Sequence, residues 1–577
     1  MANYTYVHDY SVFEFGGILQ NKDGSLLPVN TAEDARNMDT ADGNLSVAKG
    51  FEHIVEDIVP DTGKIIKLII PKGYVNEYYV ICEDNIYAYY NGAWHLLYTF
   101  TENLKRGECD FVQTKISNRE CIVLATGETQ MLKLYLDDHS VSLFGTGQYI
   151  IDESDGVTVS KWEEITDDDG TVLDYVMTLS RALTAEEWRR AYCDGVYYGK
   201  AWYGDILADE DWQTGTDKLY FYSKPNTIPQ VGDSIRITGG ASTASVAYID
   251  TMYNRLFSAG DPDAPSRLYW SAVSGDGRTI EDWLTVDGSQ DASGGYVEIG
   301  ETDGDEIVSI EAMENYILIN KRYSSWRLYG NRPSTFTVER VDKNGLEMNH
   351  ASVVTLYNQP MWFTKEGVMR YTGTIISNLE AGISGLRKFL KEELDSVSHS
   401  RGCIADHRVY FSCRTKDAEN EYDNAIVTFD ETTGSYMVRD GFVLCDITAE
   451  DGKVYLATPD RHISQFEVGT SYAGGDINAY WKTQPTDLNA KYYSKHLRKI
   501  TMRATGERME IFVYGDHHQR QVERLLNPED ENGYFVEPLN FDLSKRFQFE
   551  FRNVNGSHFC IEGGFEVQYE TERKAGV

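Results

Sequence analysis

ENYILINKRYSSWRLYG, residues Glu314 to Gly330, contains two short apolar runs on either side of a charged turn. The first run is continuously apolar and the second alternates between apolar and polar residues, which is the pattern of an antiparallel β-hairpin. The same pattern recurs along the chain and predicts seven such hairpins. Their first strands start near Tyr78, Cys121, Leu256, Tyr316, Met361, Val409 and Val454.

The recurring unit is longer than a hairpin. A further apolar strand precedes most of the hairpins, as KIIKLIIP precedes the first, and a fourth strand often follows, as FTVERV does. Most successive starts lie about 43 to 60 residues apart, in or near the range for four-stranded propeller blades. The sequence therefore predicts an all-β protein built around a seven-bladed β-propeller.

One interval is too long for a single blade. The hairpins at Cys121 and Leu256 are 135 residues apart, so a small domain is expected to interrupt the array. Within it, Thr184 lies three residues before Glu187, which is the spacing of a capping box, and short strands surround this helix signal. We therefore expect an inserted α+β module. A second helix is predicted over Ile383 to Leu394, because its apolar residues fall on one face.

The last predicted blade lacks its outer strand before the sequence changes character near Gly475. A propeller needs ring closure, because an unpaired edge between its first and last blades would be unstable. The stretch LSVAKGFEHI, Leu45 to Ile54, is the best candidate to donate that strand, and the alternative is a plain N-terminal extension.

These signals divide the chain into five predicted parts. They are an N-terminal segment with the ring-closing strand (1–62), blades 1 and 2 (63–145), the inserted module (146–240), blades 3 to 7 (241–475) and a C-terminal β-sandwich (476–577). The last part is predicted from about six longer alternating strands with turn signals between them, and it is expected to be a separate domain.

The charge balance is strongly acidic. Asp and Glu number 91 against 54 Lys and Arg, which gives a formal net charge of −37. Such a surface repels phosphate and disfavours nucleic-acid binding through a basic footprint, although it suits a chain that surrounds DNA without gripping it. The other interpretation is that the charge serves solubility.

Eight cysteines occur without a CxxC pair or a His at zinc-ligand spacing, so reduced core cysteines are expected. No segment reaches about 18 uninterrupted apolar residues. The N-terminus MANYTYVHDYSVFEFGG lacks the basic and apolar regions of a signal peptide. We expect no membrane span and synthesis in a cytoplasm.

Four stretches are candidates for chemistry. They are SGDGRTIEDW (Ser274 to Trp283), a partial match to the Asp-box of sialidase-like propellers; Asp167, Asp168, Asp169 and Gly170; TDGDE (Thr302 to Glu306); and Asp516, His517 and His518. Carboxylates suit Ca²⁺, but the first three stretches are explained by turn chemistry, and the His pair has no evident partner set. No GxSxG, HExxH, P-loop or GxGxxG motif occurs in a suitable context. We predict no catalytic, cofactor-binding or metal-binding residues, no cofactor and no enzymatic activity.

The segment from Phe15 to Ile54 resembles the opening of phage tail and neck β-propeller proteins. A Phe-Gly-Gly start is followed by the pattern P-x-N-x-A-x-D-A-x-N. The matching residues are Pro28, Asn30, Ala32, Asp34, Ala35 and Asn37. Asn30 or Thr31 is expected to cap a helix of one or two turns, and a hairpin should follow. The stretch from Tyr253 to Gly277 and the hairpins after it are similar to the propeller core of nozzle or hub proteins of short-tailed phages.

The resemblance implies a structural virion protein of a phage tail, made in the host cytoplasm. It implies a ring of copies, hexameric by analogy, around the channel through which DNA leaves, with adaptor or portal-proximal proteins and other tail proteins as neighbours. DNA would pass through without sequence-specific binding, since an acidic wall holds phosphates off. The alternative is a receptor-binding or glycan-degrading tail propeller, in which Tyr and Trp would line a sugar site.

Overall fold

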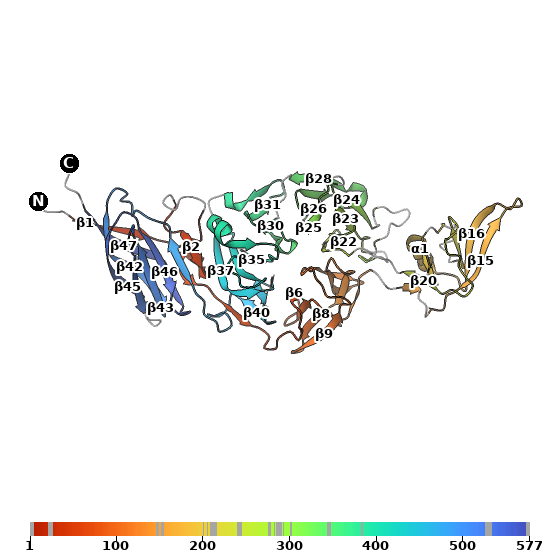
Figure 1. Ribbon diagram of the computed structural model, residues 1–577, viewed down its shortest axis with the longest axis horizontal. Coiled ribbons are helices and arrows are strands. Elements are labelled where there is room, and N and C mark those ends of the chain that lie inside the picture. Colours follow the sequence, from red (N-terminus) through yellow and green to blue (C-terminus); the bar gives the residue numbers. More distant parts are fainter. Residues whose placement is uncertain are drawn as a thin grey trace. The chain divides into compact units, whose positions relative to one another are not determined.

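The computed structural model describes residues 5–20, 27–145, 149–151, 155–199, 201–204, 206–207, 216–238, 245–274, 279–281, 283, 291, 294–300, 303–342, 348–381, 385–517, 519–525 and 533–572. These residues form strands β1 to β47 and one α-helix, so the prediction of an all-β protein is confirmed (Figure 1). They include no helix long and apolar enough to cross a bilayer. Two compact units are present, one of Met1–Thr99 with Leu346–Val577 and one of Phe100–Gly345.

The unit Phe100–Gly345 contains three four-stranded antiparallel sheets, each with its strands in sequence order. Their strands are β10 (Asp110–Ile116), β11 (Arg119–Ala125), β12 (Leu132–Tyr135) and β13 (Val141–Leu143); β21 (Tyr248–Met252), β22 (Arg255–Ala259), β23 (Arg267–Trp270) and β24 (Gly295–Glu298); and β25 (Ile307–Ala312), β26 (Tyr316–Lys321), β27 (Ser325–Tyr329) and β28 (Thr337–Asp342). The hairpin predicted between Glu314 and Gly330 is β26 and β27, with Tyr316 opposite Tyr329.

The first strands of these sheets lie side by side, with β21 next to both β10 and β25. An aspartate makes each of the two contacts. Asp110 Oδ2 accepts a hydrogen bond from the Ile249 amide at 2.7 Å, and Asp250 Oδ2 accepts one from the Ala312 amide at 2.6 Å. Because a carboxylate is a strong acceptor, each aspartate ties the edge of one sheet to the backbone of the next.

The inserted module lies within the same unit and has its own hydrophobic core, which includes Met177, Trp188 and Phe221. Its strands are β14 (Tyr149–Ile151), β15 (Val159–Thr166), β16 (Val172–Leu179), β17 (Val196–Tyr198), β18 (Ala201–Tyr203), β19 (Lys218–Phe221) and β20 (Ile235–Thr238), and its helix is α1 (Ala185–Asp194). The capping box is confirmed, since Thr184 Oγ1 accepts from the Glu187 amide at 3.2 Å and Glu187 Oε2 accepts from the Thr184 amide at 2.8 Å.

The unit of Met1–Thr99 and Leu346–Val577 contains four more small sheets. Their strands are β6 (Ile65–Ile69), β7 (Tyr78–Cys82), β8 (Asn85–Tyr90) and β9 (Ala93–Thr99); β29 (Val354–Leu356), β30 (Gln359–Thr364), β31 (Gly367–Tyr371) and β32 (Ile376–Asn378); β33 (Leu394–Ser396), β34 (Gly402–Ala405), β35 (Arg408–Thr415), β36 (Asp423–Asp430) and β37 (Ser435–Leu444); and β38 (Asp446–Glu450), β39 (Lys453–Ala457), β40 (Ile463–Phe466) and β5 (Phe51–His53). Strand β34 lies beside β29 and β38, and β38 lies beside β6.

The contact between β38 and β6 repeats the aspartate arrangement. Asp446 is fully buried, and its Oδ2 accepts a hydrogen bond from the Leu68 amide at 2.7 Å. Its Oδ1 lies 3.6 Å from Lys67 Nζ and 3.4 Å from Arg401 Nε. A buried carboxylate is costly without such cations, so the pair of basic side chains offsets its desolvation.

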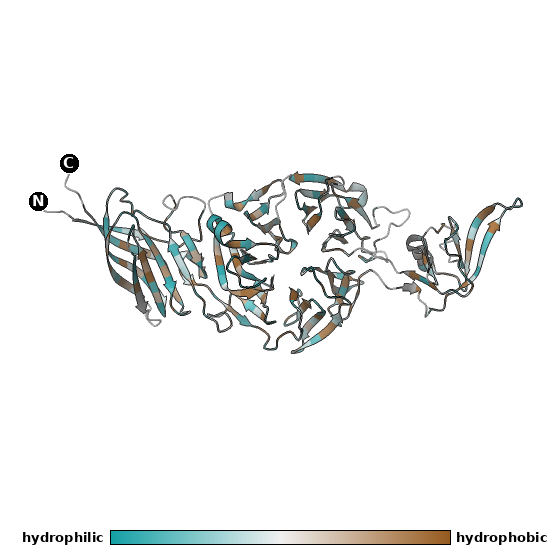
Figure 2. Cartoon of the chain, in the orientation of Figure 1, coloured by the Kyte–Doolittle hydropathy of each residue, from teal (hydrophilic) through white to brown (hydrophobic). Residues whose placement is uncertain are grey.

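Two larger sheets complete this unit. One contains β1 (Thr5–Val12), β3 (Met38–Asp39), β4 (Leu45–Val47), β42 (Lys495–Gly506), β45 (Tyr534–Ser544) and β47 (Phe559–Glu572), and the other contains β2 (Ala32–Arg36), β41 (Tyr480–Thr483), β43 (Arg508–Tyr514), β44 (Gln519–Leu525) and β46 (Gln548–Asn553). Along their strands hydrophobic and hydrophilic residues alternate (Figure 2). Phe551 and Phe565, one from each sheet, meet at a ring distance of 5.3 Å, so the sheets share one core.

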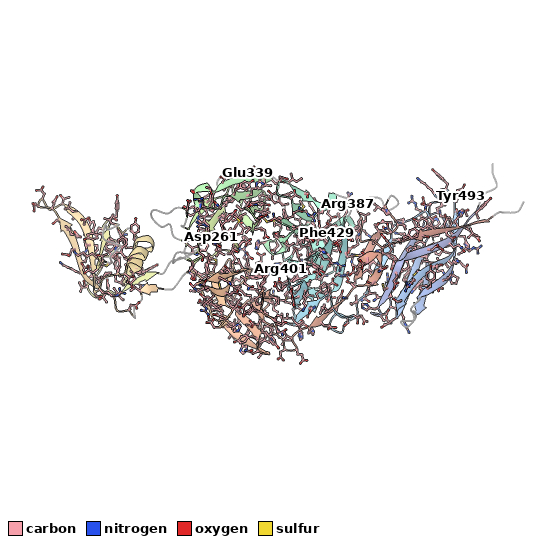
Figure 3. The ribbon with its side chains drawn as sticks, turned by 180° about the vertical axis from the view of Figure 1, so that it is seen from behind. Asp261, Glu339, Arg387, Arg401, Phe429 and Tyr493 are labelled. Atoms are coloured by element: carbon pink, nitrogen blue, oxygen red, sulfur yellow. The ribbon has the colours of Figure 1, made fainter. Side chains whose placement is uncertain are left out.

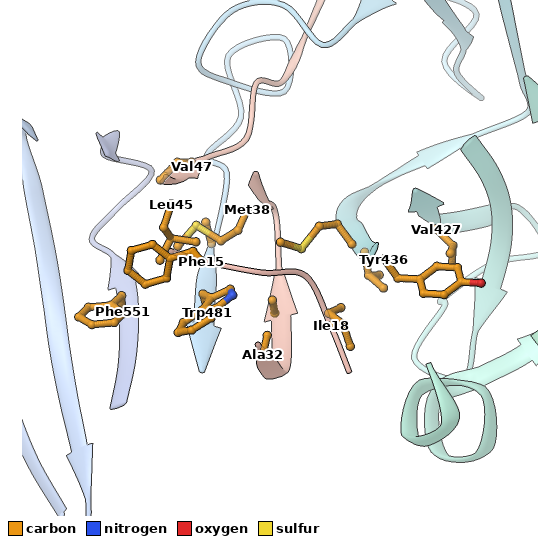
Figure 4. Packing of buried hydrophobic residues seen from close by; sticks show 14 of the residues in the cluster. Phe15, Ile18, Ala32, Met38, Leu45, Val47, Val427, Tyr436, Trp481 and Phe551 are labelled. Carbon is orange, nitrogen blue, oxygen red and sulfur yellow. The ribbon is translucent and has the colours of Figure 1, made fainter. Parts of the chain in front are cut away.

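Phe15 fills the centre of that core from the N-terminal segment. Its ring contacts Trp481 edge-on at 5.0 Å and Phe551 at 6.0 Å (Figure 4). Trp481 is fully buried and donates its indole N–H to the Gly16 carbonyl at 3.0 Å. The sequence did not predict that strands from the first 47 residues would join the C-terminal sheets.

The prediction of a short helix after Asn30 or Thr31 is wrong, because Ala32–Arg36 forms strand β2, which pairs with β41. The pairing register shifts between Ala32 and Asp34. This bulge turns Ala32 and Ala35 to the same buried side, although they are three residues apart. The bulge therefore produces the spacing that is typical of a helix.

The second predicted helix is confirmed in part. Residues 387 and 388 are helical and continue into a π-helical turn, Phe389–Glu393, and strand β33 begins at Leu394, where the helix was expected to end. Residues 382–384, at its predicted start, lie outside the described residues.

Part of the stretch predicted to complete the last blade pairs as expected. Phe51–His53 forms β5 and pairs with β40, with Phe51 opposite Phe466, so it supplies the fourth strand of that sheet. The prediction is wrong for Leu45–Val47, which forms β4 and pairs with β3 and β47. The chain crosses between the two sheets at Ala48 to Gly50, where the Ala48 amide donates to the Asn37 carbonyl at 2.9 Å.

Replacing Gly50 tests how closely the chain before β5 packs against Ser471. A Cβ at Gly50 would overlap the carbonyl of Ser471, which is backbone and has little freedom to move. We expect Gly50→Ala to lower the free energy of unfolding by at least about 2 kcal/mol through this overlap, measured by urea unfolding. Limited proteolysis should also cut faster between β5 and β6.

The matched control is Gly73→Ala, because Gly73 has open space around its Cβ position and a φ of +82°. The Gly73→Ala substitution should lower the free energy of unfolding by only about 1 kcal/mol, the strain of an alanine in a left-handed conformation. Equal effects of the two substitutions would show that β5 is not tightly held.

Candidate functional site

The four stretches considered as chemical sites lie in different turns of the fold. Asp167 caps the turn between β15 and β16, where its Oδ1 accepts from the amides of Asp169 at 3.1 Å and Thr171 at 2.8 Å. The predicted hairpin turn is confirmed there. The described residues contain no group of three or more His, Cys, Asp or Glu side chains placed to hold a metal ion.

The stretch TDGDE encloses a buried lysine. Thr302 lies outside the described residues, but Asp303 Oδ1 is 2.6 Å from Nζ of Lys321, whose side chain is fully buried. The same ammonium donates to the Ile299 carbonyl at 2.7 Å. Asp305 Oδ2 accepts the Tyr323 amide at 2.9 Å. The two carboxylates therefore connect the loop before β25 to the end of β26 and the turn that follows it.

The remaining two stretches are described only in part. In SGDGRTIEDW, residues 275–278 and 282 lie outside the described residues, and Glu281 Oε1 contacts Lys133 Nζ at 2.5 Å. Asp516 Oδ2 accepts the Lys545 amide at 2.6 Å, and His518 is outside the described residues. In the described residues, each of the four stretches belongs to a different connection between strands.

The densest group of charged side chains lies elsewhere, around the N-terminal strands. We call it the arginine junction, and it consists of Arg36, Arg408 and Arg439 with Asp34, Asp39, Glu393, Asp430, Asp440 and Glu467. All of these residues belong to the unit of Met1–Thr99 and Leu346–Val577. Three cations face six carboxylates, so the junction is acidic as a whole.

Arg36 lies at one end of the junction and is 6% exposed. Its guanidinium contacts Asp34 at 2.9 Å and Asp440 at 3.1 Å, and it also pairs with Glu393. It sits over the ring of Phe389, 5.5 Å from the ring centre. A planar guanidinium can bind several carboxylates at once, so Arg36 joins β2, β37 and the π-helical turn.

Asn37 follows Arg36 and is almost fully buried, with a φ of +54°. Its Nδ2 donates to Asp440 Oδ1 at 2.9 Å and to the Asn478 carbonyl at 2.7 Å. Its Oδ1 accepts from the Asp440 amide at 2.9 Å and from the Tyr472 hydroxyl at 2.8 Å. Every donor and acceptor of this amide is therefore used, and the positive φ suits Asn better than most residues.

Arg408 and Arg439 hold the other end of the junction. Arg408 binds both carboxylate oxygens of Asp39 at 3.0 Å and lies 3.3 Å from Asp430. Arg439 is 1% exposed, donates to the Met38 carbonyl and lies 3.6 Å from Glu467. The two arginines thus both hold β3, Arg439 at Met38 and Arg408 at Asp39.

The carboxylates of the junction respond differently to burial. Burial acts to raise the pKa of Asp39, but Arg439 and Arg408 outweigh it and the pKa is lowered. For Asp440, burial dominates over the nearby Arg36, and the pKa is raised. Ion pairs with the two arginines therefore outweigh burial at Asp39, whereas burial outweighs both the ion pair with Arg36 and the hydrogen bond from Asn37 at Asp440.

Three cavities lined by described residues adjoin the junction. The first, about 600 Å³, is lined by Arg36, Phe389, Glu393 and Asp440 among others. The second, about 470 Å³, is lined by Arg408 and Glu467 among others. The third, about 180 Å³, is lined by Asp39, Thr428, Thr432, Thr433, Ser435 and Arg439 among others. In the described part of the chain, Thr428 Oγ1 and Arg439 Nε are buried without a hydrogen-bond partner. Water or a small polyol is the kind of molecule that would satisfy them.

The sequence pattern from Pro28 to Asn37 is explained by this junction. Ala32 and Ala35 are fully buried in β2, while Asp34 and Asn37 bind its polar partners. Sequence reasoning found the pattern but missed its role, because the partners on β35 and β37 are some 400 residues further along the chain. The signal was the run of small, acidic and amide residues without the apolar face of a helix.

No protein-family description and no curated protein matches this chain. Among solved structures, the extracellular domain of a one-component system from B. thetaiotaomicron is 12% identical, with a TM-score of 0.26 over 94% of this chain and 82% of that chain. A β-propeller domain from Myceliophteria thermophila is 9% identical, with a TM-score of 0.29 over 72% of this chain and 100% of that chain. An exo-β-1,3-galactanase from Phanerochaete chrysosporium is 7% identical, with a TM-score of 0.22 over 57% and 97%. Similarity at this level assigns neither a family nor an activity to this chain.

Substituting Asn37 tests the junction directly. Asn37→Ala leaves four hydrogen-bonding partners unsatisfied and forces Ala to a φ of +54°, so we expect a loss of about 3 kcal/mol in the free energy of unfolding. Asn37→Gly removes the strain but not the lost bonds, and should be about 1 kcal/mol less destabilising than the Ala variant. Urea unfolding at neutral pH measures both. A wild-type stability of Asn37→Ala would contradict this role.

Glu380, in the turn Leu379–Ala381, makes the stability of this unit depend on pH. Burial raises its pKa to about 7, against the opposing effects of the Leu386 amide, which donates to its Oε2 at 2.5 Å, and of the nearby Tyr436. A carboxyl whose pKa rises on folding stabilises most when it is protonated, so stability should fall by about 2 kcal/mol between pH 5.5 and 8.

The variant Glu380→Gln keeps the acceptor for Leu386 without the charge. It should be more stable than wild type at pH 8, and the difference should shrink as the pH falls towards 5.5. Unfolding curves at four pH values measure the difference, and a constant difference would exclude Glu380 as its source.

Proposed function

We propose that this chain is a structural virion protein of a phage tail, forming a ring around the DNA exit channel without enzymatic activity. The single observation that carries the proposal is the ordered resemblance of two stretches, Phe15 to Ile54 and Tyr253 to Gly277 with the hairpins after it, to tail and neck propeller proteins. The net charge of −37 supports it, because an acidic wall does not bind passing phosphates.

The proposal includes the architecture. The seven small sheets would be the blades of one seven-bladed propeller, with β5 completing the last blade and the module around α1 inserted between the second and third. The two larger sheets would form a β-sandwich built from both ends of the chain. What supports this is the strand order of the sheets and the side-by-side first strands within each unit.

Ring assembly would place copies around a symmetry axis, with six as the number suggested by the resemblance. A closed ring of identical copies needs head-to-tail contacts between two different surfaces of the chain. Adaptor or portal-proximal proteins would lie on one side of the ring and further tail proteins on the other.

A specific observation favours a second candidate function, a receptor-binding or glycan-degrading tail protein. The cavity of about 180 Å³ at the arginine junction presents hydroxyls, carboxylates and an arginine, which are groups that hydrogen-bond sugars. Binding on a glycan array, lost in Thr428→Val, would support this alternative.

Particles made without this protein separate the two functions. Under the channel role, they should package DNA and then leak it or fail to infect, as measured by the DNA content of purified particles and by plaque formation. If the particles instead keep and eject their DNA normally but no longer adsorb to cells, the channel role is wrong.

A further inference from the structure

Charge is distributed unevenly along the chain. Residues 476–577 hold 14 Lys and Arg against 16 Asp and Glu, a net charge of −2, so residues 1–475 carry the remaining −35. Residues 476–577, which supply most strands of the two larger sheets, are therefore nearly neutral, whereas the rest of the chain is strongly acidic.

An exposed loop with two tyrosines lies at one end of those sheets. We call residues 486–494, between β41 and β42, the tyrosine loop. Tyr492 is 86% exposed and Tyr493 is 48% exposed. Tyr493 projects from the surface of these sheets (Figure 3). Large aromatic side chains at this exposure are unusual for a surface that faces only water, and Tyr is enriched at protein interfaces.

The backbone of the tyrosine loop is held in one shape. Lys495, at the start of β42, is fully buried, and its Nζ donates to the carbonyls of Ala490 and Tyr493 at 3.0 Å each. Burial lowers the pKa of this ammonium. Leu488 is buried in the core, and its carbonyl accepts the Tyr569 hydroxyl at 2.8 Å. A loop fixed in this way loses little conformational freedom on binding.

Exposed basic side chains lie in the loop and in the turn beside it, and two nearby aspartates accept backbone amides. Lys491, Lys545 and Arg546 are exposed. Asp487 Oδ1 accepts the Asn489 amide at 3.0 Å, and Asp516 Oδ2 accepts the Lys545 amide. The loop and the turn that carries Lys545 and Arg546 lie at the same end of the sheets, since the Thr486 amide donates to the Phe547 carbonyl at 2.8 Å.

We propose that the tyrosine loop, together with Lys545 and Arg546, binds the acidic surface of a second copy of this chain. The tyrosines provide the aromatic contact area, and the basic side chains provide charge complementarity to residues 1–475 of the neighbour. This contact joins two different surfaces, as a head-to-tail ring requires. The inference rests on the proposed function and names the contact that would build its ring.

Sedimentation velocity of the full-length protein tests the contact. At low salt, about 0.05 M, the wild type should associate with rising protein concentration, and at about 0.5 M salt the association should weaken, because exposed charges are then screened. The double variant Tyr492→Ser with Tyr493→Ser should associate at least tenfold more weakly. The matched control is Tyr323→Ser with Tyr534→Ser, which removes two exposed tyrosines elsewhere and should leave association unchanged.

Lys495→Met tests the loop shape without touching the exposed surface. It should weaken association about as much as the tyrosine variant, while the hydrophobic replacement keeps the sheets folded. Circular dichroism confirms folding. If Lys495→Met does not fold, the surface variants decide the question alone.

Three results would overturn the inference. They are a wild type that stays monomeric at low salt up to the highest concentration, association that the tyrosine variant leaves intact, and binding of duplex DNA that depends on Lys545 and Arg546. The second result would leave ring assembly standing through another surface. The channel role itself is judged by the DNA content of particles, so its failure is seen separately.

Discussion

The buried amide of Asn37 is the contact on which the arrangement of the N-terminal segment depends. The chain turns there from β2, in the five-stranded sheet, to β3, in the six-stranded sheet. This turn needs a left-handed φ together with two donors and two acceptors at fixed positions, facing Asp440, Tyr472 and Asn478. Asp lacks the donors, and Gln does not share the preference of Asn for this conformation. One residue thus determines which strands enter each sheet.

Neighbouring small sheets depend on a second kind of contact, an aspartate that accepts an amide from the adjacent first strand. Asp110, Asp250 and Asp446 all make it; Asp110 and Asp446 begin their strands, and Asp250 is the third residue of its strand. The contact satisfies a backbone donor that the adjacent sheet leaves unpaired at its edge. Because this contact recurs, sheets with dissimilar sequences pack side by side in the same way. Acidic residues inside the fold therefore have a structural role and are not by themselves evidence of catalysis.

Local patterns in the sequence predicted the local structure well. The hairpins, the capping box at Thr184 and the strand Phe51–His53 follow from alternation and spacing alone. The failures have one physical cause, which is that the deciding partner is remote in sequence. The helix predicted from a cap at Asn30 or Thr31 is instead strand β2, because Ala32–Arg36 pairs with β41, which lies far along the chain. The arginine junction was missed for the same reason, since Arg36 meets Glu393 and Asp440 only in the folded chain.

The buried cations of the fold differ in what they contact. Lys133, Lys321 and Arg36 each contact a carboxylate, so each gains Coulomb energy that offsets its desolvation. Lys495 is as buried as these, but its Nζ contacts two carbonyls of the tyrosine loop. A neutral side chain of similar length would fill the same space at a lower desolvation cost. What the ammonium adds is the shape of that loop, and the loop's exposed side chains are tyrosines. The ammonium thus holds the loop that carries the exposed Tyr492 and Tyr493, and this fixed shape is what the proposed contact with a second copy uses.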